Sequence, residues 1–337
     1  MLGKIRSLLG HPAAAAAAPW AQPYSATATE SDIIHCFRLL LGRRPNQEEW
    51  KGHSMRAGEP LPSVVASYLA SLEFARLKLV QQARPQTLQV AQLPEFRIYV
   101  AADDLDVGRD VLADNYEKDV AAVFRRVLRP GMAVVDVGAN IGYFTMLSAS
   151  LVGAAGRVLA VEPNPRNARM LEASRRLNGF DQVTVAQVAA GRETAILVLH
   201  AAHSNGTTSQ PAADLDALLA AETVPALRLD DLMPAGTPIG LMKLDVEGAE
   251  YNALLGARGI LERDRPILIT EFSPGMMSGI SGITGAEYLR WIVAQHYRIG
   301  VVQPDGSVSA AGTDPEPILA EHRARAVDHI DIVATPA

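Results

Sequence analysis

The sequence predicts an α/β protein with a doubly wound, mostly parallel sheet, preceded by a small helical domain. From Met132 onward, short apolar runs alternate with helical stretches, a pattern typical of a parallel sheet with helices on both faces. A glycine-containing turn joins one strand to the next helix at 137–142, as in ligand-binding sheets of this class. Residues 30–80 show only helical periodicity, which indicates a separate module.

Composition limits the functions that the chain can have. Its 337 residues are enough for two domains, and 48% hydrophobic with 20% charged residues is ordinary for a globular protein. A formal net charge of -6 provides no attraction for a phosphate backbone, so no nucleic-acid partner is expected. The single cysteine, Cys36, excludes a disulfide within the chain, and a cytoplasmic location is expected. The absence of an apolar run of about 18 residues predicts no transmembrane segment.

The first part of the chain predicts a tail followed by short helices. Residues 1–28 are rich in alanine and proline and are interpreted as a disordered tail. A small helical module is predicted over 29–80, where Ile33, Phe37 and Leu41 share one helical face.

A second helix of this module is predicted to start at Asn46, which has the capping-box spacing to Glu49. A third is predicted within 64–72. Residues 81–95 contain glutamine and proline and are interpreted as a linker, so that the α/β domain spans 96–337.

The elements of the α/β domain follow from hydrophobic periodicity and breaker residues. Strands are predicted at 96–100, 134–137, 157–161, 183–188, 241–244, 267–270, 299–302 and 330–333. Helices are predicted at 119–128, 144–151, 165–178, 248–261 and 285–295. Segment 196–240 is longer than one crossover needs, and it is expected to hold an inserted hairpin and a mobile loop around 200–210.

The strongest motif is VVDVGANIGYFT at 134–145. Gly138 and Gly142 are separated by three residues, which departs from the G-x-G-x-x-G of nicotinamide-dependent dehydrogenases. Asp136 lies two residues before the first glycine. A carboxylate in this turn would repel a pyrophosphate but suits a ligand with an ammonium group, such as the methionyl part of S-adenosylmethionine.

A second acidic residue, Glu162, follows Gly142 by 20 residues and ends the second strand of this pattern. A carboxylate at this position can accept both hydroxyls of a ribose. Pro163 and Asn164 then turn the chain into the next helix. The alternative is a plain doubly wound fold in which the acidic residues only cap helices.

Three motifs together resemble the FkbM-type methyltransferases: DVGANIGYFT, AVEPNP and LMKLDVEGAE, with RLDDL just upstream of the third. The resemblance covers about 96–335. It implies a class I methyltransferase fold, S-adenosylmethionine as the donor, and an O-methyl acceptor such as a sugar hydroxyl. The donor-binding residues that it implies are Asp136, Gly138, Ala139, Asn140, Gly142 and Thr145 at the methionyl part, Glu162 at the ribose, Pro163 and Asn164 beside the adenosine, and Ala190 near the adenine.

The helical module has a weaker resemblance of its own. Its pattern FRLLLGRRP…SLEF is similar to a small module attached to bacterial surface-carbohydrate enzymes. We expect this module to offer a contact for another protein, and the sequence leaves the oligomeric state open.

Catalytic candidates follow the strand predicted at 241–244. Lys243 and Asp245 lie at its end, where ligands bind in open α/β sheets, and Asp245 is predicted to act as a base or as a metal ligand. Glu271 ends the neighbouring strand, so that the two carboxylates can hold one Mg²⁺. The alternative is a structural ion pair between Lys243 and Asp245 or Glu271. His203, in the polar segment HSNGTTS, is a second candidate base, or else a solvated loop histidine.

Acceptor contacts are less well defined by the sequence. Asn205 can bond an acceptor hydroxyl, while Phe272, Met276 and Met277 line either an acceptor pocket or the core.

Three functions are therefore considered. The first is an S-adenosylmethionine-dependent O-methyltransferase acting on a hydroxyl of a sugar in a glycan or glycosylated metabolite. The second is an oxidoreductase that binds a dinucleotide or nucleotide sugar, against which Asp136 and the glycine spacing weigh. The third is a non-catalytic binding module, against which Asp136, Glu162 and Asp245 weigh.

Overall fold

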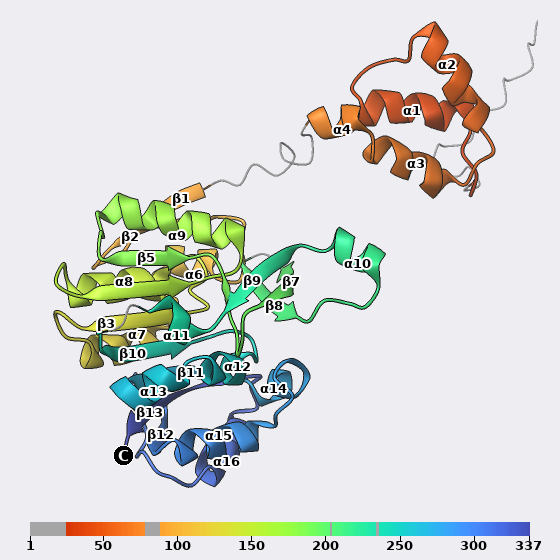
Figure 1. Cartoon of the computed structure of the whole chain (residues 1–337). Coiled ribbons are helices and arrows are strands. Elements are labelled where there is room, and N and C mark those ends of the chain that lie inside the picture. The colour runs from red at the N-terminus through yellow and green to blue at the C-terminus, as the bar shows by residue number, and fades with distance from the viewer. Residues whose placement is uncertain (1–24, 78–87, 203, 234–235) are drawn as a thin grey trace, which may run out of the picture. The chain divides into compact units, whose positions relative to one another are not determined.

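The computed structural model describes residues 25–77, 88–202, 204–233 and 236–337 (Figure 1). It consists of two compact units that divide after residue 85. Within the described ranges, none of the helices is both long enough and apolar enough to cross a membrane.

The first unit is helical, as predicted. Its elements are α1 (Glu30–Leu40), α2 (Gln47–His53), a 3₁₀ turn (Ser54–Arg56), α3 (Leu61–Leu69) and α4 (Leu72–Leu77). The core contains Ile33, Phe37, Val64 and Tyr68, together with Cys36, which is buried. Residues 1–24 of the predicted tail lie outside the described residues, but Ala28 is buried against this unit.

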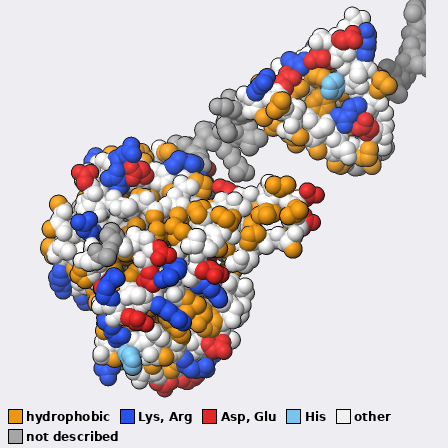
Figure 2. Space-filling view, in the orientation of Figure 1, with side chains coloured by type: hydrophobic (Ala, Val, Ile, Leu, Met, Phe, Trp, Pro, Cys, Tyr) orange, Lys and Arg blue, Asp and Glu red, His pale blue; other side chains and the backbone are white. Residues whose placement is uncertain are grey.

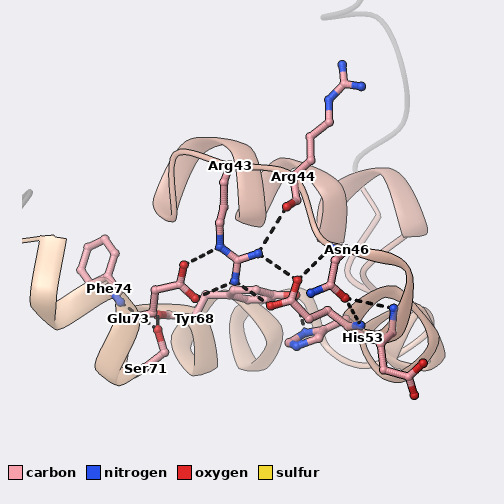
Figure 3. A network of polar contacts seen from close by, with 10 residues as sticks. Arg43, Arg44, Asn46, His53, Tyr68, Ser71, Glu73 and Phe74 are labelled. Carbon is pink, nitrogen blue, oxygen red and sulfur yellow. Dashed lines mark hydrogen bonds and ion pairs between the residues drawn. The ribbon is translucent and has the colours of Figure 1, made fainter.

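A single arginine ties the helices of this unit together (Figure 3). The guanidinium of Arg43 donates to both oxygens of Glu49, at 2.8 and 2.9 Å, and to both oxygens of Glu73, at 2.5 and 2.8 Å. Glu49 also completes the predicted capping box with Asn46. The GRRP segment therefore has a structural role, because Arg43 joins the start of α2 to α4.

The second unit is built on a seven-stranded sheet of order β12-β13-β11-β10-β3-β4-β5. Its strands are β3 (Ala133–Val137), β4 (Arg157–Val161), β5 (Val183–Ala186), β10 (Ile239–Leu244), β11 (Ile267–Phe272), β12 (Tyr297–Val301) and β13 (Ile330–Pro336). Strands β3, β4, β5, β10 and β11 pair in parallel, and β13 is antiparallel to both of its neighbours. The predicted doubly wound, mostly parallel sheet is confirmed.

Helices cover both faces of this sheet (Figure 1). One face packs on α7 (Lys118–Val127), α8 (Tyr143–Val152) and α9 (Pro165–Asn178), and the other on α11 (Leu229–Leu232), α12 (Glu250–Leu255), α13 (Arg258–Asp264), α15 (Gly285–Ala294) and α16 (Glu316–Arg325). Two short helices, α6 (Gly108–Leu112) and α14 (Pro274–Ile280), complete the unit.

Two predicted boundaries are wrong. Strand β1 (Leu88–Gln92) lies inside the predicted linker and pairs with β2 (Arg97–Ala101), so sheet structure begins before residue 96. The helix predicted at 248–261 is broken between α12 and α13 at Gly256. A Cβ there would lie 2.0 Å from the carbonyl oxygen of Gly191, so the close approach of two backbones breaks the helix.

The inserted hairpin is confirmed, and it belongs to a second sheet of order β6-β9-β7-β8. The strands are β6 (Ala189–Ala190), β7 (Ala195–Ala202), β8 (Asn205–Ser209) and β9 (Thr223–Leu227). Much of the segment expected to be a mobile loop is thus strand β8, paired with β7. A projecting arm with α10 (Leu215–Ala220) carries exposed hydrophobic side chains, including Leu215 and Leu219 (Figure 2).

Candidate active site

A cavity of about 440 Å³ lies at the edge of the large sheet where β3, β4, β10 and β11 end. This is the edge at which open α/β sheets bind ligands, and the volume is within the usual range for ligand sites. The predicted site residues that line it are Gly138, Asn140, Glu162, Pro163, Asn164, Ala190, Asp245 and Glu271. Residues far apart in the sequence are therefore brought together as expected.

The turn after β3 needs glycine for reasons of backbone geometry. Gly138 has φ +78°, and a Cβ there would lie 1.7 Å from the carbonyl oxygen of Asp245. Gly142 has φ +99°, and a Cβ there would lie 2.7 Å from Leu171 in α9. Asn140, between them, also adopts a positive φ of 51°. The glycines thus let the turn pack closely on β10 and α9.

Glu162 joins the two loops that border this part of the cavity. Its Oε2 accepts from the backbone N–H of Asn140 and its Oε1 from that of Asn164, both at 2.8 Å. The side chain is 5% exposed, and burial raises its pKa to about 7 although both bonds act in the opposite direction. The carboxylate is therefore fixed in place at the end of β4.

Asp136, the predicted methionyl contact, is deeply buried. It is 1% exposed, and its Oδ2 accepts from the Thr145 hydroxyl at 2.6 Å. Its Oδ1 has no hydrogen-bond partner among the described residues, and burial raises its pKa. Asp136 and Ala139 border only a small void of about 10 Å³ beside the main cavity, while Gly142 and Thr145 line neither.

Lys243 and Asp245 form the ion pair that was the alternative to a catalytic pair. Lys243 Nζ lies 2.8 Å from Asp245 Oδ2 and 4.7 Å from the centre of the Phe144 ring. Burial disfavours the lysine charge, but Asp245, Glu117 and Asp136 outweigh it and raise the lysine pKa. Lys243 thus stays protonated and outside the main cavity, whereas Asp245 lines it.

The predicted magnesium site is not supported. Across the described ranges, no group of three or more His, Cys, Asp or Glu side chains is arranged to hold a metal ion. Burial and the nearby carboxylates of Asp245, Glu250 and Glu247 raise the pKa of Glu271 to about 10. Without a cation, Glu271 is therefore a neutral acid at pH 7.

The remaining candidates fall into three groups. His203 lies outside the described residues. Phe272 and Met277 are fully buried in the core, as the core interpretation predicts, whereas Met276 is exposed and lines neither the core nor the cavity. Asn205 does line the cavity, and its Oδ1 accepts from Asn140 Nδ2 at 3.2 Å.

Several cavity residues could not be found from the sequence. Tyr116 and Glu117 come from the segment before α7, and Asp328 and His329 from the segment before β13. Glu117 has φ 37°, an uncommon conformation for a residue other than glycine. Burial raises its pKa to about 7 although Lys243 opposes the shift. No local motif signals these positions, because only the tertiary fold brings them to the sheet edge.

Comparison with known proteins agrees with this geometry. Residues 136–299 match the model of the methyltransferase FkbM domain. No curated protein matches the chain.

The similar solved structures include methyltransferases of low identity. The methyltransferase FkbM from Methylobacillus flagellatus KT is 18% identical with a TM-score of 0.39, over 67% of this chain and 52% of that one. An S-adenosylmethionine-dependent O-methyltransferase from Thermotoga maritima is 12% identical with a TM-score of 0.37, over 66% of each chain. An rRNA methylase from Streptococcus thermophilus is 12% identical with a TM-score of 0.37, over 64% of this chain and 94% of that one. This chain thus spans about half of the Methylobacillus protein.

The family match includes the turn after β3, Glu162 and Asp245, which are the residues that the fold gathers around the cavity. Residues 136–299, just under half of the chain, are therefore similar to the methyltransferase FkbM domain.

Proposed function

We propose that this chain transfers the methyl group of S-adenosylmethionine to a hydroxyl of an uncharged sugar, in a glycan or a glycosylated metabolite. The observation that carries the proposal is that one cavity contains both Glu162, from the donor motif, and Asp245, a carboxylate oriented by a buried lysine. A donor and a proton acceptor can then act on one substrate.

The donor half of the cavity fits a nucleoside. A carboxylate has about four acceptor positions, and backbone N–H groups occupy one position on each oxygen of Glu162. A hydrogen bond from the Asn167 side chain also lowers the pKa of Glu162, and the acceptor positions that are left can take ribose hydroxyls. Ala189, Ala190 and Leu199 line the same cavity and offer apolar contacts for an adenine ring.

For the ammonium at the methionyl end of the donor, we propose a different carboxylate partner from Asp136, which the sequence favoured. Asp136 is buried against Thr145, outside the main cavity. Glu117 lines the cavity together with Gly138. Lys243 is attracted by three carboxylates, those of Asp245, Glu117 and Asp136, so this region has an excess of negative charge. We assign the ammonium of the donor to Glu117.

The chemistry needs alignment and removal of one proton. The bound donor supplies a methyl group on a positively charged sulfur, so transfer forms an oxygen–methyl bond, breaks the sulfur–methyl bond and releases the hydroxyl proton. Asp245 accepts this proton, while Lys243 holds one of its oxygens in place. Glu271, a neutral acid at pH 7, is a hydrogen-bond donor to the acceptor.

Charge supports an acceptor without phosphate. Asp106, Asp110, Glu247 and Asp328 also line the cavity, and His329 is the only basic residue among the described residues that line it. Carboxylates repel a phosphate but accept hydrogen bonds from sugar hydroxyls.

Labelled methyl transfer tests this function. The chain is incubated with S-[methyl-³H]adenosylmethionine and separate cell fractions of neutral carbohydrate, acidic carbohydrate, lipid and RNA, with and without EDTA. We expect label in neutral carbohydrate, in equal amounts with and without EDTA. Label confined to RNA, or to acidic carbohydrate, contradicts the acceptor assignment. Thermal stabilisation by NAD but not by S-adenosylhomocysteine would instead favour the oxidoreductase.

A further inference from the structure

The turn of the β7–β8 hairpin is bonded to both loops of the donor motif. Asn167, near the start of α9, donates from Nδ2 to the carbonyl oxygen of Ser204 at 2.7 Å. Asn140, in the turn after β3, donates from Nδ2 to Oδ1 of Asn205 at 3.2 Å. The backbone N–H of Asn140 also binds Glu162, so the hairpin turn lies beside the carboxylate assigned to the ribose.

Two buried polar atoms at this junction lack partners. Ser204 is 4% exposed and Asn167 is 1% exposed, and neither Ser204 Oγ nor Asn167 Oδ1 has a hydrogen-bond partner among the described residues. The Asn167 amide cannot simply turn over, because its oxygen would then face the Ser204 carbonyl oxygen. Buried polar atoms are normally paired, and Ser204 lines the cavity.

The small sheet carries the hairpin and several other residues that line the cavity. Ala189 and Ala190 in β6, Leu199 in β7 and Thr208 in β8 line the cavity with Ser204, and β9 connects β6 to β7 in the sheet. The hairpin therefore lies on the same side as the apolar residues that suit the adenine.

We propose that the hairpin turn at 204–206 forms the outer wall of the nucleoside half of the donor site. In this arrangement Asn167 is a positioning residue, which holds Ser204 so that its hydroxyl can bond the adenosine. This inference rests on the proposed function, and it moves Asn205 and its neighbours from the acceptor side, where the sequence placed them, to the donor side.

Two nucleosides and three variants test the proposal by calorimetry. S-adenosylhomocysteine contains the amino-acid part, whereas 5′-methylthioadenosine lacks it. Asn167→Ala removes the bond to the hairpin together with a hydrogen bond to Glu162, whereas Ser204→Ala removes only the hydroxyl and is specific to the hairpin. Asn178→Ala is the matched control, because Asn178 is on the same helix and donates to the carbonyl oxygens of Arg97 and Ser174, at 2.6 and 2.7 Å, but does not line the cavity.

We expect Asn167→Ala and Ser204→Ala to raise the dissociation constants of both ligands by the same factor. The factor is about five- to tenfold, as for the loss of one buried hydrogen bond. Asn178→Ala should lower the melting temperature while both dissociation constants stay within about twofold. Should Asn167→Ala fail to fold, Ser204→Ala decides alone.

Three results would overturn the inference. They are unchanged binding of both ligands by the folded variants, weaker binding of S-adenosylhomocysteine alone, or an equal loss of affinity in the Asn178→Ala variant. If the unmodified chain binds neither nucleoside, the proposed function itself fails. Failure of the inference alone is recognised by normal binding in the unmodified chain.

Discussion

Lys243 Nζ lies 2.8 Å from Asp245 Oδ2, with Lys243 4% exposed and Asp245 facing the cavity. The pair therefore joins a charge in the protein interior to a carboxylate at the cavity. Under the proposed function, we expect mutation to separate the two residues, with Lys243 affecting mainly stability and Asp245 mainly methyl transfer.

Asp245→Asn keeps the shape of the side chain but removes the base. We expect methyl transfer to fall by about 10²- to 10⁴-fold, the usual contribution of a general base, with S-adenosylhomocysteine affinity nearly unchanged. Lys243→Met leaves Asp245 without its ion-pair partner and also removes the nearby charge from buried Asp136. We expect it to destabilise the fold by about 3–5 kcal/mol, as when one partner of a buried pair is lost. Rate assays and urea unfolding measure these effects. An Asp245→Asn chain with full activity would exclude this residue as the base.

Stability should decrease with pH across the neutral range. Folding raises the pKa values of Glu117, Glu162, Glu250 and Asp331 to about 7, in each case first through burial. The native state therefore holds more protons than the unfolded chain above pH 4.5. This contribution to stability is complete below the unfolded pKa values and is lost as the pH rises to 7.

Urea unfolding of the ligand-free chain at pH 5 and pH 8 measures this effect. We expect a higher free energy of unfolding at pH 5, and Glu162→Gln should reduce the difference by roughly 3 kcal/mol. Equal stability at both pH values would contradict the assignment of these raised pKa values.

Unlike the stability of the fold, the affinity for the donor should increase as the pH rises. An ionised Glu162 accepts hydrogen bonds from ribose hydroxyls more strongly than the neutral acid does, so affinity for S-adenosylhomocysteine should rise as the pH passes through about 7. Calorimetry at several pH values checks this, and Glu162→Gln should bind weakly with no such rise. A wild-type affinity that falls between pH 6 and 8 would count against Glu162 as the ribose partner.

Glu117→Gln separates the two parts of the donor. We expect about tenfold weaker binding of S-adenosylhomocysteine, since one charge-assisted hydrogen bond is lost, and unchanged binding of 5′-methylthioadenosine. Glu247→Gln is a close control, because Glu247 lines the same cavity and also has a positive φ, 54°. If Asp136→Asn shows this selective loss and Glu117→Gln does not, the ammonium belongs to Asp136.

Arg43→Lys should lower the melting temperature of the first unit almost as much as Arg43→Ala. Lysine cannot donate to two carboxylates in the forked geometry that Arg43 uses with Glu49 and Glu73. The two pairs are partly exposed, so the effect is limited to a few degrees. Lys51→Ala, which removes the more exposed pair with Glu48, is the control. Full retention of stability in Arg43→Lys would show that the forked geometry is unimportant.

Local rules explain which parts of the fold the sequence could predict. The bounds of α9 were predicted correctly because Asn164 caps its start and Gly179 ends it with a positive φ of 68°. Strands β3 and β4 were found because their apolar runs are buried on both faces. Helix α12 could not be separated from α13, because the break depends on the carbonyl group of a distant residue, Gly191.

The same distinction applies to the site. Glu162 follows the last residue of its strand, so its position at the cavity could be predicted from the end of the apolar run. Asp136 lies inside β3, where side chains alternate between faces, so its carboxylate is directed into the layer of α8 and Thr145. Glu117 and the hairpin turn join the site only through long-range packing, which no short motif encodes.

The antiparallel strand β13 has a consequence for the order in which the protein matures. Strand β12 has β13 as its only neighbour in the large sheet, and Asp328 and His329, just before β13, line the cavity. During synthesis, the parallel strands can assemble while the chain is still on the ribosome. The edge of the sheet and one wall of the cavity form only when residues 328–336 are available, so a nascent chain should complete its donor loops before the cavity is closed on this side.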